Sequence, residues 1–131
     1  MRERVKRYFE DFEKALTNLE SAAEQSRDDL DIDGTIKRFE LCYELSWKLI
    51  KEYLADMGII CKNPRDCFKS AFLNDLIDSE DTWLKMIDDR NYLVHTYTFE
   101  ESRKIFERIK GSYVTSLKYL YTAIRQKSEG E

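Results

Sequence analysis

The sequence predicts an all-α protein that folds as an up-and-down antiparallel bundle of four or five helices. Apolar side chains recur at steps of three and four residues along most of the chain, which is the spacing of one helix face. The 131 residues include only 4 glycines and 1 proline, whereas barrels and sandwiches with many turns need more of both. With 42% hydrophobic and 37% charged residues, the chain can bury a core beneath a solvated surface. We therefore expect residues 1–131 to form a single domain.

A continuous apolar stripe predicts the first helix near the N-terminus. The members of this stripe are Val5, Phe9, Phe12, Leu16, Leu19 and Ala23. Their steps of four and three residues place them on one side of several helical turns. An acidic stretch without periodicity follows at residues 28–34, and we interpret it as a connection in which Asp33 is the N-cap of the next helix.

The second helix is predicted from Thr35 to Met57, where apolar residues cover more than one helix face. Such a helix either lies centrally in the bundle or also packs against a second subunit. Gly58 suits the C′ position, at which a helix ends in a left-handed conformation.

Capping signals predict where the remaining helices begin. Asn63 has the form of an N-cap followed by proline, and Ser79 precedes two acidic residues at the positive end of a further helix. Thr98 is followed three residues later by glutamate, which is the spacing of a capping box. Within these helices we expect Phe72 and Val94 to face the core. Short connections then make helices that follow one another antiparallel.

Composition also limits the kind of protein. No segment approaches the roughly 20 apolar residues of a membrane span, and the charged N-terminus does not resemble a signal peptide, so we expect a cytoplasmic protein. Cys42, Cys61 and Cys67 show neither a disulfide framework nor a zinc pattern, and we expect reduced thiols with no metal and no cofactor. Because the net charge is −4, any contact with RNA would use a local site rather than the whole surface.

One segment carries the residues best suited to chemistry. His95 is the only histidine, and histidine is the side chain whose ordinary pKa lies nearest neutrality. In a helix, Asn91 would share a face with His95 and Arg90 would share a line with Tyr97. Arginine and histidine near a helix C-terminus can also serve a purely structural purpose, because their charge offsets the helix dipole. Spacing alone leaves both interpretations open.

The segment resembles a known motif. Arg90, Asn91, three further residues and His95 are similar to the signature of HEPN domains (higher eukaryotes and prokaryotes nucleotide-binding). Tyr97 extends the resemblance to the Arg-x-x-x-x-His-x-Tyr form of HEPN toxins that are paired with minimal nucleotidyltransferase (MNT) antitoxins. Residues 38–49 resemble the second helix of the bacterial nucleotidyltransferase substrate-binding protein family. Further similarity falls at residues 63–65, residues 83–86 and Tyr113.

This resemblance implies a helical-bundle homodimer that cleaves RNA without a metal ion. Arg90 and His95 match the pair implicated in cleavage, and Asn91 matches the polar position after the arginine. Tyr97 matches the tyrosine that a partner nucleotidyltransferase adenylylates to silence the toxin. A two-fold dimer would bring two histidines and two arginines into one cleft, which meets the need for a base, an acid and a cation on the phosphate.

Other residues and functions remain as alternatives. Glu40 and Glu44 lie one turn apart and could hold Arg90 or Arg38, bind a substrate, or form an ordinary solvated pair. Trp47, like its aromatic neighbours, is expected to be a core or dimer contact rather than a base-stacking residue. The alternative function is a non-catalytic subunit that presents a substrate, or its own tyrosine, to a separate nucleotidyltransferase. A structural dimerisation module is the third possibility.

Overall fold

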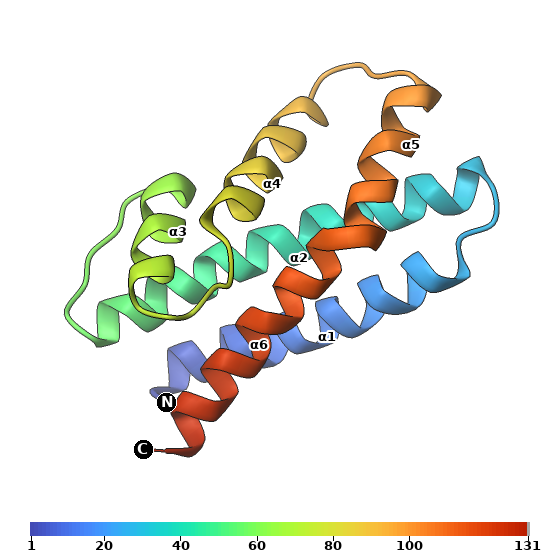
Figure 1. Ribbon diagram of the computed structural model, residues 1–131. Coiled ribbons are helices and arrows are strands. Elements are labelled where there is room, and N and C mark those ends of the chain that lie inside the picture. Colours follow the sequence, from blue (N-terminus) through green and yellow to red (C-terminus); the bar gives the residue numbers. More distant parts are fainter. Residues whose placement is uncertain (131) are drawn as a thin grey trace.

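The computed structural model describes residues 1–130 and shows a bundle of helices with no strand in that range. Helices α1 (Glu3–Gln25) and α2 (Asp29–Asp56) lie antiparallel, and α3 (Pro64–Leu73) packs against α2 and α4 (Glu80–Tyr92) (Figure 1). Helix α5 (Phe99–Arg108), the π-helix η1 (Ile109–Tyr113) and α6 (Val114–Glu129) follow one another without a break and return along α1 (Figure 1). The predicted all-α antiparallel bundle is confirmed.

Aromatic side chains from several helices meet in one core. The ring of Phe39 on α2 stacks on that of Tyr113 with centroids 5.4 Å apart, and Phe68 on α3 contacts Trp83 on α4 at 4.8 Å. Each fully buried side chain of this size stabilises the fold by about 1.5–3 kcal/mol. Because Tyr113 belongs to η1 and Trp83 to α4, this core fixes the position of α4 relative to α2 and the last helix.

The interpretation of residues 28–34 as a connection is wrong, because α2 already begins at Asp29. Asp28 is the N-cap, and its carboxylate accepts a hydrogen bond from the Asp31 backbone N–H at 2.8 Å. Asp33 therefore lies inside the helix and is not a cap. A run of acidic residues is stabilised at the positive end of a helix, which compensates for the weak helix propensity of Asp and Gly34.

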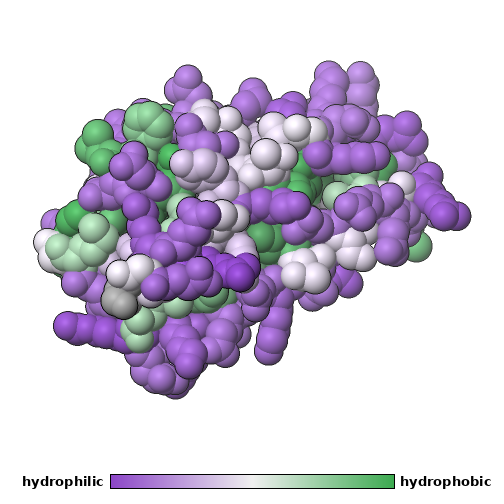
Figure 2. All heavy atoms as spheres, turned by 60° about the horizontal axis from the view of Figure 1, so that its bottom comes forward, coloured by the Kyte–Doolittle hydropathy of each residue, from purple (hydrophilic) through white to green (hydrophobic). Residues whose placement is uncertain are grey.

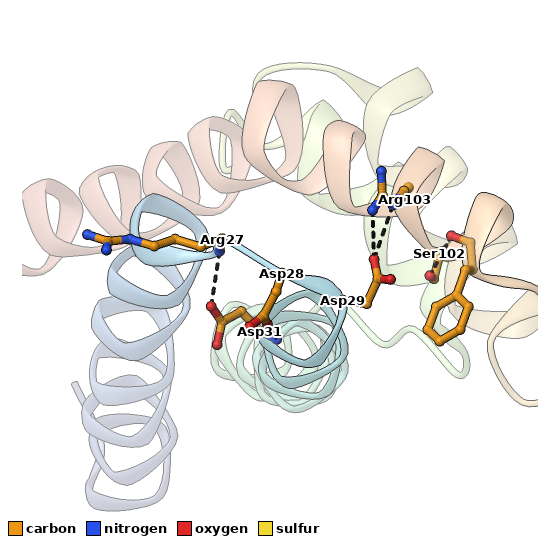
Figure 3. A network of polar contacts seen from close by, with 7 residues as sticks. Arg27, Asp28, Asp29, Asp31, Ser102 and Arg103 are labelled. Atoms are coloured by element: carbon orange, nitrogen blue, oxygen red, sulfur yellow. Dashed lines mark hydrogen bonds and ion pairs between the residues drawn. The ribbon is translucent and has the colours of Figure 1, made fainter.

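Two further contacts hold the start of α2, as Figure 3 shows. The backbone N–H of Arg27 donates to the Asp31 carboxylate at 3.0 Å. The Arg103 guanidinium on α5 donates two hydrogen bonds to one oxygen of Asp29, at 3.1 and 2.9 Å (Figure 3). The second contact crosses 74 positions of sequence, so no local pattern predicts it.

The predicted capping residues are confirmed at four helix ends. Asn63 and Ser79 accept hydrogen bonds from the backbone of their helices, and Thr98 forms a complete capping box with Glu101. Gly58 has a φ of 83° and ends α2, and the following N–H donates to the Leu54 carbonyl at 2.9 Å. This arrangement is a Schellman motif, which favours glycine at the left-handed position.

The structure joins Cys61 to Cys67 by a disulfide, so the expectation of reduced thiols is wrong for this pair. Cys61 lies in the connection after α2, and Cys67 lies in α3. Their Cα atoms come within 5.1 Å because the chain turns back at the Asn63 cap. Cys42 is a free buried thiol, and burial raises its pKa well above the ordinary value.

Reduction of the Cys61–Cys67 disulfide is expected to lower the free energy of unfolding by about 2 kcal/mol, because the cross-link limits the freedom of the unfolded chain. Urea unfolding with and without dithiothreitol measures the difference. The control is the Cys61→Ala/Cys67→Ala double variant, whose unfolding curve should not respond to the reductant. If dithiothreitol does not change the urea unfolding curve of the wild-type chain, the two thiols are not linked in solution.

Polar side chains cover most of the surface in Figure 2, and apolar ones gather toward the left of that view. In Figure 1 the left side holds the end of α2 and the whole of α3. Phe72 is 43% exposed there and Val94 is 59% exposed beyond α4, so the expectation that both face the core is wrong. Among residues 1–130, no helix is both long and apolar enough to cross a membrane.

Candidate functional site

Arg90 lies in the last turn of α4 and points to the middle of α2. Its Nη2 atom is 3.4 Å from Oε1 of Glu44, and the Arg90 side chain remains 33% exposed. Its Nε is buried and has no hydrogen-bond partner among the described residues. The guanidinium is thus held from one side by α2, while about a third of the side chain stays exposed to solvent.

The Glu44 carboxylate bridges Arg90 and Trp47. One oxygen contacts the guanidinium, and the other accepts a hydrogen bond from the Trp47 indole Nε1 at 3.1 Å. The spacing of three residues on α2 brings the carboxylate and the indole to the same side of the helix. Burial and the negative charge of Glu44 raise the pKa of neighbouring Tyr43 to about 12, with Arg90 acting in the opposite direction.

Two hollows lie on either side of the ion pair between Arg90 and Glu44. The first, which we name the Trp47 hollow, has a volume of about 340 Å³ and is bounded by α2, the start of α3 and the end of α4. The second, the Lys37 hollow, has a volume of about 400 Å³. The Trp47 hollow includes Trp47, Asn63, Arg65, Arg90 and Asn91, and the Lys37 hollow includes Lys37, Arg38, Glu40, Leu41 and Arg90.

His95 follows the end of α4 in a short segment that leads to α5. Helix α4 ends at Tyr92, and the backbone N–H of His95 donates to the Tyr92 carbonyl at 3.1 Å. The His95 side chain is exposed and is not among the described residues that line either hollow. The structure therefore groups Arg90, Asn91, Glu40 and Glu44 around the hollows and leaves the imidazole exposed, outside the lining of both.

Tyr97 is half-buried against the core, two residues beyond His95. Burial raises the pKa of its phenol, and the negative charges of Asp33 and Glu40 raise it further. The phenol is therefore protonated at neutral pH and has carboxylates from α2 in its surroundings. No sequence pattern links Asp33 to Tyr97, and their proximity becomes evident only in the folded chain.

A polar network next to Arg90 was missed by sequence reasoning. Asp89 is only 7% exposed, and the Arg108 guanidinium donates to both of its carboxylate oxygens at 2.7 Å. The Tyr113 hydroxyl also donates to this carboxylate. Burial and the hydrogen bond to Asp89 raise the pKa of Tyr113. The network joins the last turn of α4 to α5 and η1, and so fixes the turn that carries Arg90.

A sequence signal for this network existed. Trp83, Met86 and Leu93 mark the buried face of α4, and Asp89 falls on the same face at helical spacing. A carboxylate on an apolar face needs a buried cationic or hydrogen-bonding partner, because an unpaired buried charge is costly. The sequence alone does not identify this partner, because Arg108 lies on α5 and meets Asp89 of α4 only in the folded chain.

The π-helix η1 gives Tyr113 its place in the network. Its wider turn shifts the register of the side chains within the otherwise regular helix from Phe99 to Glu129. Both Arg108, just before η1, and Tyr113, at its end, then reach the Asp89 carboxylate. Short π-helical turns are frequent at functional positions, and this one supports the turn that holds Arg90.

The fold and the arginine–histidine segment define a HEPN-type helical bundle. The family model described as "Nucleotidyltransferase substrate binding protein like" matches residues 7–126. The chain belongs to this nucleotidyltransferase substrate-binding (HEPN) family. Within residues 1–130, no group of three or more His, Cys, Asp or Glu side chains is arranged to hold a metal ion.

One curated relative and two solved structures are similar to this chain. A Haemophilus influenzae protein named "Probable ribonuclease HepT" is 29% identical over 103 residues, which cover 75% of this chain and 70% of the relative. A solved H. influenzae structure, described as the fold of a substrate-binding domain of a nucleotidyltransferase, is 25% identical with a TM-score of 0.67. The match covers 93% of this chain and 97% of that one. A tri-AMPylated Shewanella oneidensis HEPN toxin in complex with MNT antitoxin has a TM-score of 0.77 at 18% identity, over 96% of this chain and 99% of that one, which shows the shared fold.

Proposed function

We propose that this chain is the HEPN toxin of a toxin–antitoxin pair, acting as a homodimeric, metal-independent endoribonuclease. The observation that carries the proposal is the position of Arg90. Its guanidinium is paired with Glu44 but remains partly exposed, and Arg90 is close in sequence to the exposed imidazole of His95. Similarity to a protein named as a probable ribonuclease supports it. The roles of Arg90, Asn91 and His95 follow from their match to the motif.

The proposed cleavage uses the RNA itself as nucleophile. The 2′-hydroxyl oxygen attacks the adjacent phosphorus, the bond from phosphorus to the 5′-oxygen breaks, and the products are a 2′,3′-cyclic phosphate and a free 5′-hydroxyl. One His95 accepts the 2′ proton and a second donates a proton to the leaving oxygen, which is why two chains are needed. Arg90 binds the phosphate oxygens as negative charge accumulates on them, and Asn91 contributes a hydrogen bond.

The test combines purified protein with expression in cells. The wild-type chain should cleave single-stranded RNA in the presence of EDTA, arrest growth when expressed alone, and have the mass of a dimer by light scattering. The His95→Ala chain should permit growth at equal protein level. If wild-type and His95→Ala chains permit equal growth and neither cleaves RNA, the ribonuclease proposal fails.

The alternative function is a non-catalytic subunit that binds substrate for a separate nucleotidyltransferase. It is favoured by the placement of His95 outside the lining of both hollows and by the carboxylates near Tyr97. Under either function, the partner is a nucleotidyltransferase of the MNT type. The two functions differ in RNA cleavage, which only the first predicts.

Tyr97 is the proposed site of modification by that partner. Its phenol oxygen would attack the α-phosphorus of ATP, pyrophosphate would leave, and the phenolic proton would pass to a base. The partner with ATP should therefore raise the intact mass by one or more AMP units, and Tyr97→Phe should abolish this increase in mass. Tyr92→Phe is a matched control three residues before His95, and it should still be modified. If the Tyr97→Phe chain gains the same mass as wild type, the modified residue lies elsewhere.

A further inference from the structure

The Trp47 hollow has a composition that the proposed roles of Arg90 and His95 do not explain. Its wall combines an indole, two side-chain amides and two guanidinium groups, from Trp47, Asn63, Asn91, Arg65 and Arg90. Its volume of about 340 Å³ lies within the range of small-molecule sites. It also adjoins the guanidinium that the proposed function assigns to a phosphate.

Trp47 is positioned differently from the second tryptophan of the chain. Trp83 is fully buried in the core, whereas Trp47 is half-buried and lines the hollow. The hydrogen bond from its Nε1 to Glu44 and the Lys51 ammonium 5.8 Å from its ring centroid fix the indole in orientation. A fixed aromatic surface beside a cleft is suited to stacking with a planar ring, because little side-chain freedom is lost on binding.

The charges around the hollow favour an anionic group. Arg65 and Arg90 contribute two positive charges against the single negative charge of Glu44. The Arg90 side chain remains 33% exposed although its guanidinium is paired with Glu44. The Asn63 amide is already engaged as the cap of α3, so Asn91, which is exposed, is the amide free to meet the edge of a base.

We propose that the Trp47 hollow is a binding subsite for one nucleotide, with the base stacked on Trp47 and the phosphate held by Arg65 and Arg90. Stacking on an aromatic side chain combined with guanidinium contacts to phosphate is the usual chemistry by which proteins bind single-stranded nucleotides. An amide that both donates and accepts suits the polar edge of a base. This subsite deepens the proposed function, because it places a base next to the phosphate at Arg90.

Two sources can supply such a nucleotide: a free mononucleotide or a residue of an RNA strand. The full-length chain labelled with ¹⁵N reports on both, because its two indole N–H signals belong to Trp47 and Trp83. The Trp47→Phe variant assigns the signals. The titrants are AMP, ribose 5-phosphate and a 2′-O-methyl tetranucleotide that cannot be cleaved through the 2′-oxygen.

The Trp47 signal should shift saturably with AMP, with the tetranucleotide or with both, while the Trp83 signal stays in place. A response to the tetranucleotide alone identifies RNA as the source, and a response to AMP alone identifies a free nucleotide; either supports the subsite. Ribose 5-phosphate should produce a smaller shift because it lacks a base. Equal shifts with ribose 5-phosphate and AMP, or no shift with any titrant, would overturn the proposal.

Calorimetric affinities of variants test the stacking directly. Trp47→Leu should weaken nucleotide binding about five- to a hundred-fold, because stacking on an aromatic residue is lost. Tyr119→Leu is the matched control, since Tyr119 is an exposed aromatic on α6 that lines a separate hollow. This variant should bind the nucleotide with the affinity of the wild-type chain. A Trp47→Leu chain that binds as tightly as wild type but changes its mass in light scattering would assign Trp47 to an interface between copies instead.

The subsite and the ribonuclease proposal can fail separately. If RNA cleavage occurs and the Trp47 signal never responds, the subsite is wrong and the ribonuclease assignment stands. If the Trp47 signal responds and no RNA is cleaved, the subsite stands and the chain is a nucleotide-binding subunit.

Discussion

The His95→Ala variant is expected to cleave RNA about 10² to 10⁴ times more slowly than the wild-type chain. General acid–base catalysis by one positioned side chain typically contributes a factor of this size. The imidazole is exposed in the structure, so its removal leaves no cavity and the fold should be retained. Initial rates on a defined oligoribonucleotide in EDTA, together with thermal unfolding of both proteins, measure the two effects separately.

The matched control for this variant is Thr96→Ala. Thr96 is the exposed neighbour of His95 in the same segment, and its replacement should leave the cleavage rate within about twofold of wild type. Equal losses in both variants would point to the shape of the segment rather than to proton transfer. A His95→Ala rate equal to wild type would remove the imidazole from the mechanism.

The Asp89→Asn variant is expected to lose about 3 kcal/mol of stability. Asp89 is the shared acceptor of Arg108 and Tyr113, and loss of one member of a buried ion pair typically costs about 3–5 kcal/mol. The lower end applies because the Arg108 side chain is 33% exposed and can regain water. Such a loss is a large fraction of the roughly 5–15 kcal/mol that stabilises a small domain. Urea unfolding monitored by circular dichroism measures it.

Two comparison variants sharpen this measurement. Asp88→Asn removes the same charge from the exposed neighbouring position and should change stability by less than about 0.5 kcal/mol. The double variant Asp89→Asn/Arg108→Met removes both charges and should be more stable than Asp89→Asn alone, because no unpaired charge remains. If Asp88→Asn and Asp89→Asn are equally stable, the network does not hold α4 in place.

Local sequence signals located most of the helices because their causes are local. A cap such as Asn63 acts on backbone groups within three residues, and the Gly58 turn depends on the φ that glycine tolerates. The acidic start of α2 was misjudged because two stabilising effects, the Asp28 cap and the helix dipole, outweighed poor helix propensity. The disulfide was missed for a different reason: the two thiols become neighbours only after α3 has folded back.

The site residues differ in how far the sequence could place them. Arg90 and His95 were singled out by their chemical nature and spacing, but the ion pair with Glu44 depends on how α4 crosses α2. The same limitation applies to Asp33, which comes near Tyr97 through the packing of α5 and its preceding segment on α2. Periodicity identifies which face of a helix is buried, whereas the partner of a polar residue on that face is decided by tertiary structure.

The ion pair between Arg90 and Glu44 has a consequence for selectivity. Since the carboxylate already balances part of the guanidinium charge, chloride or inorganic phosphate gains little by approaching it. A ligand that makes a second contact at the same time gains more, because the two attachments act together. We therefore expect the paired Arg90 guanidinium to bind larger anionic ligands that also contact the adjoining wall more tightly than it binds small anions.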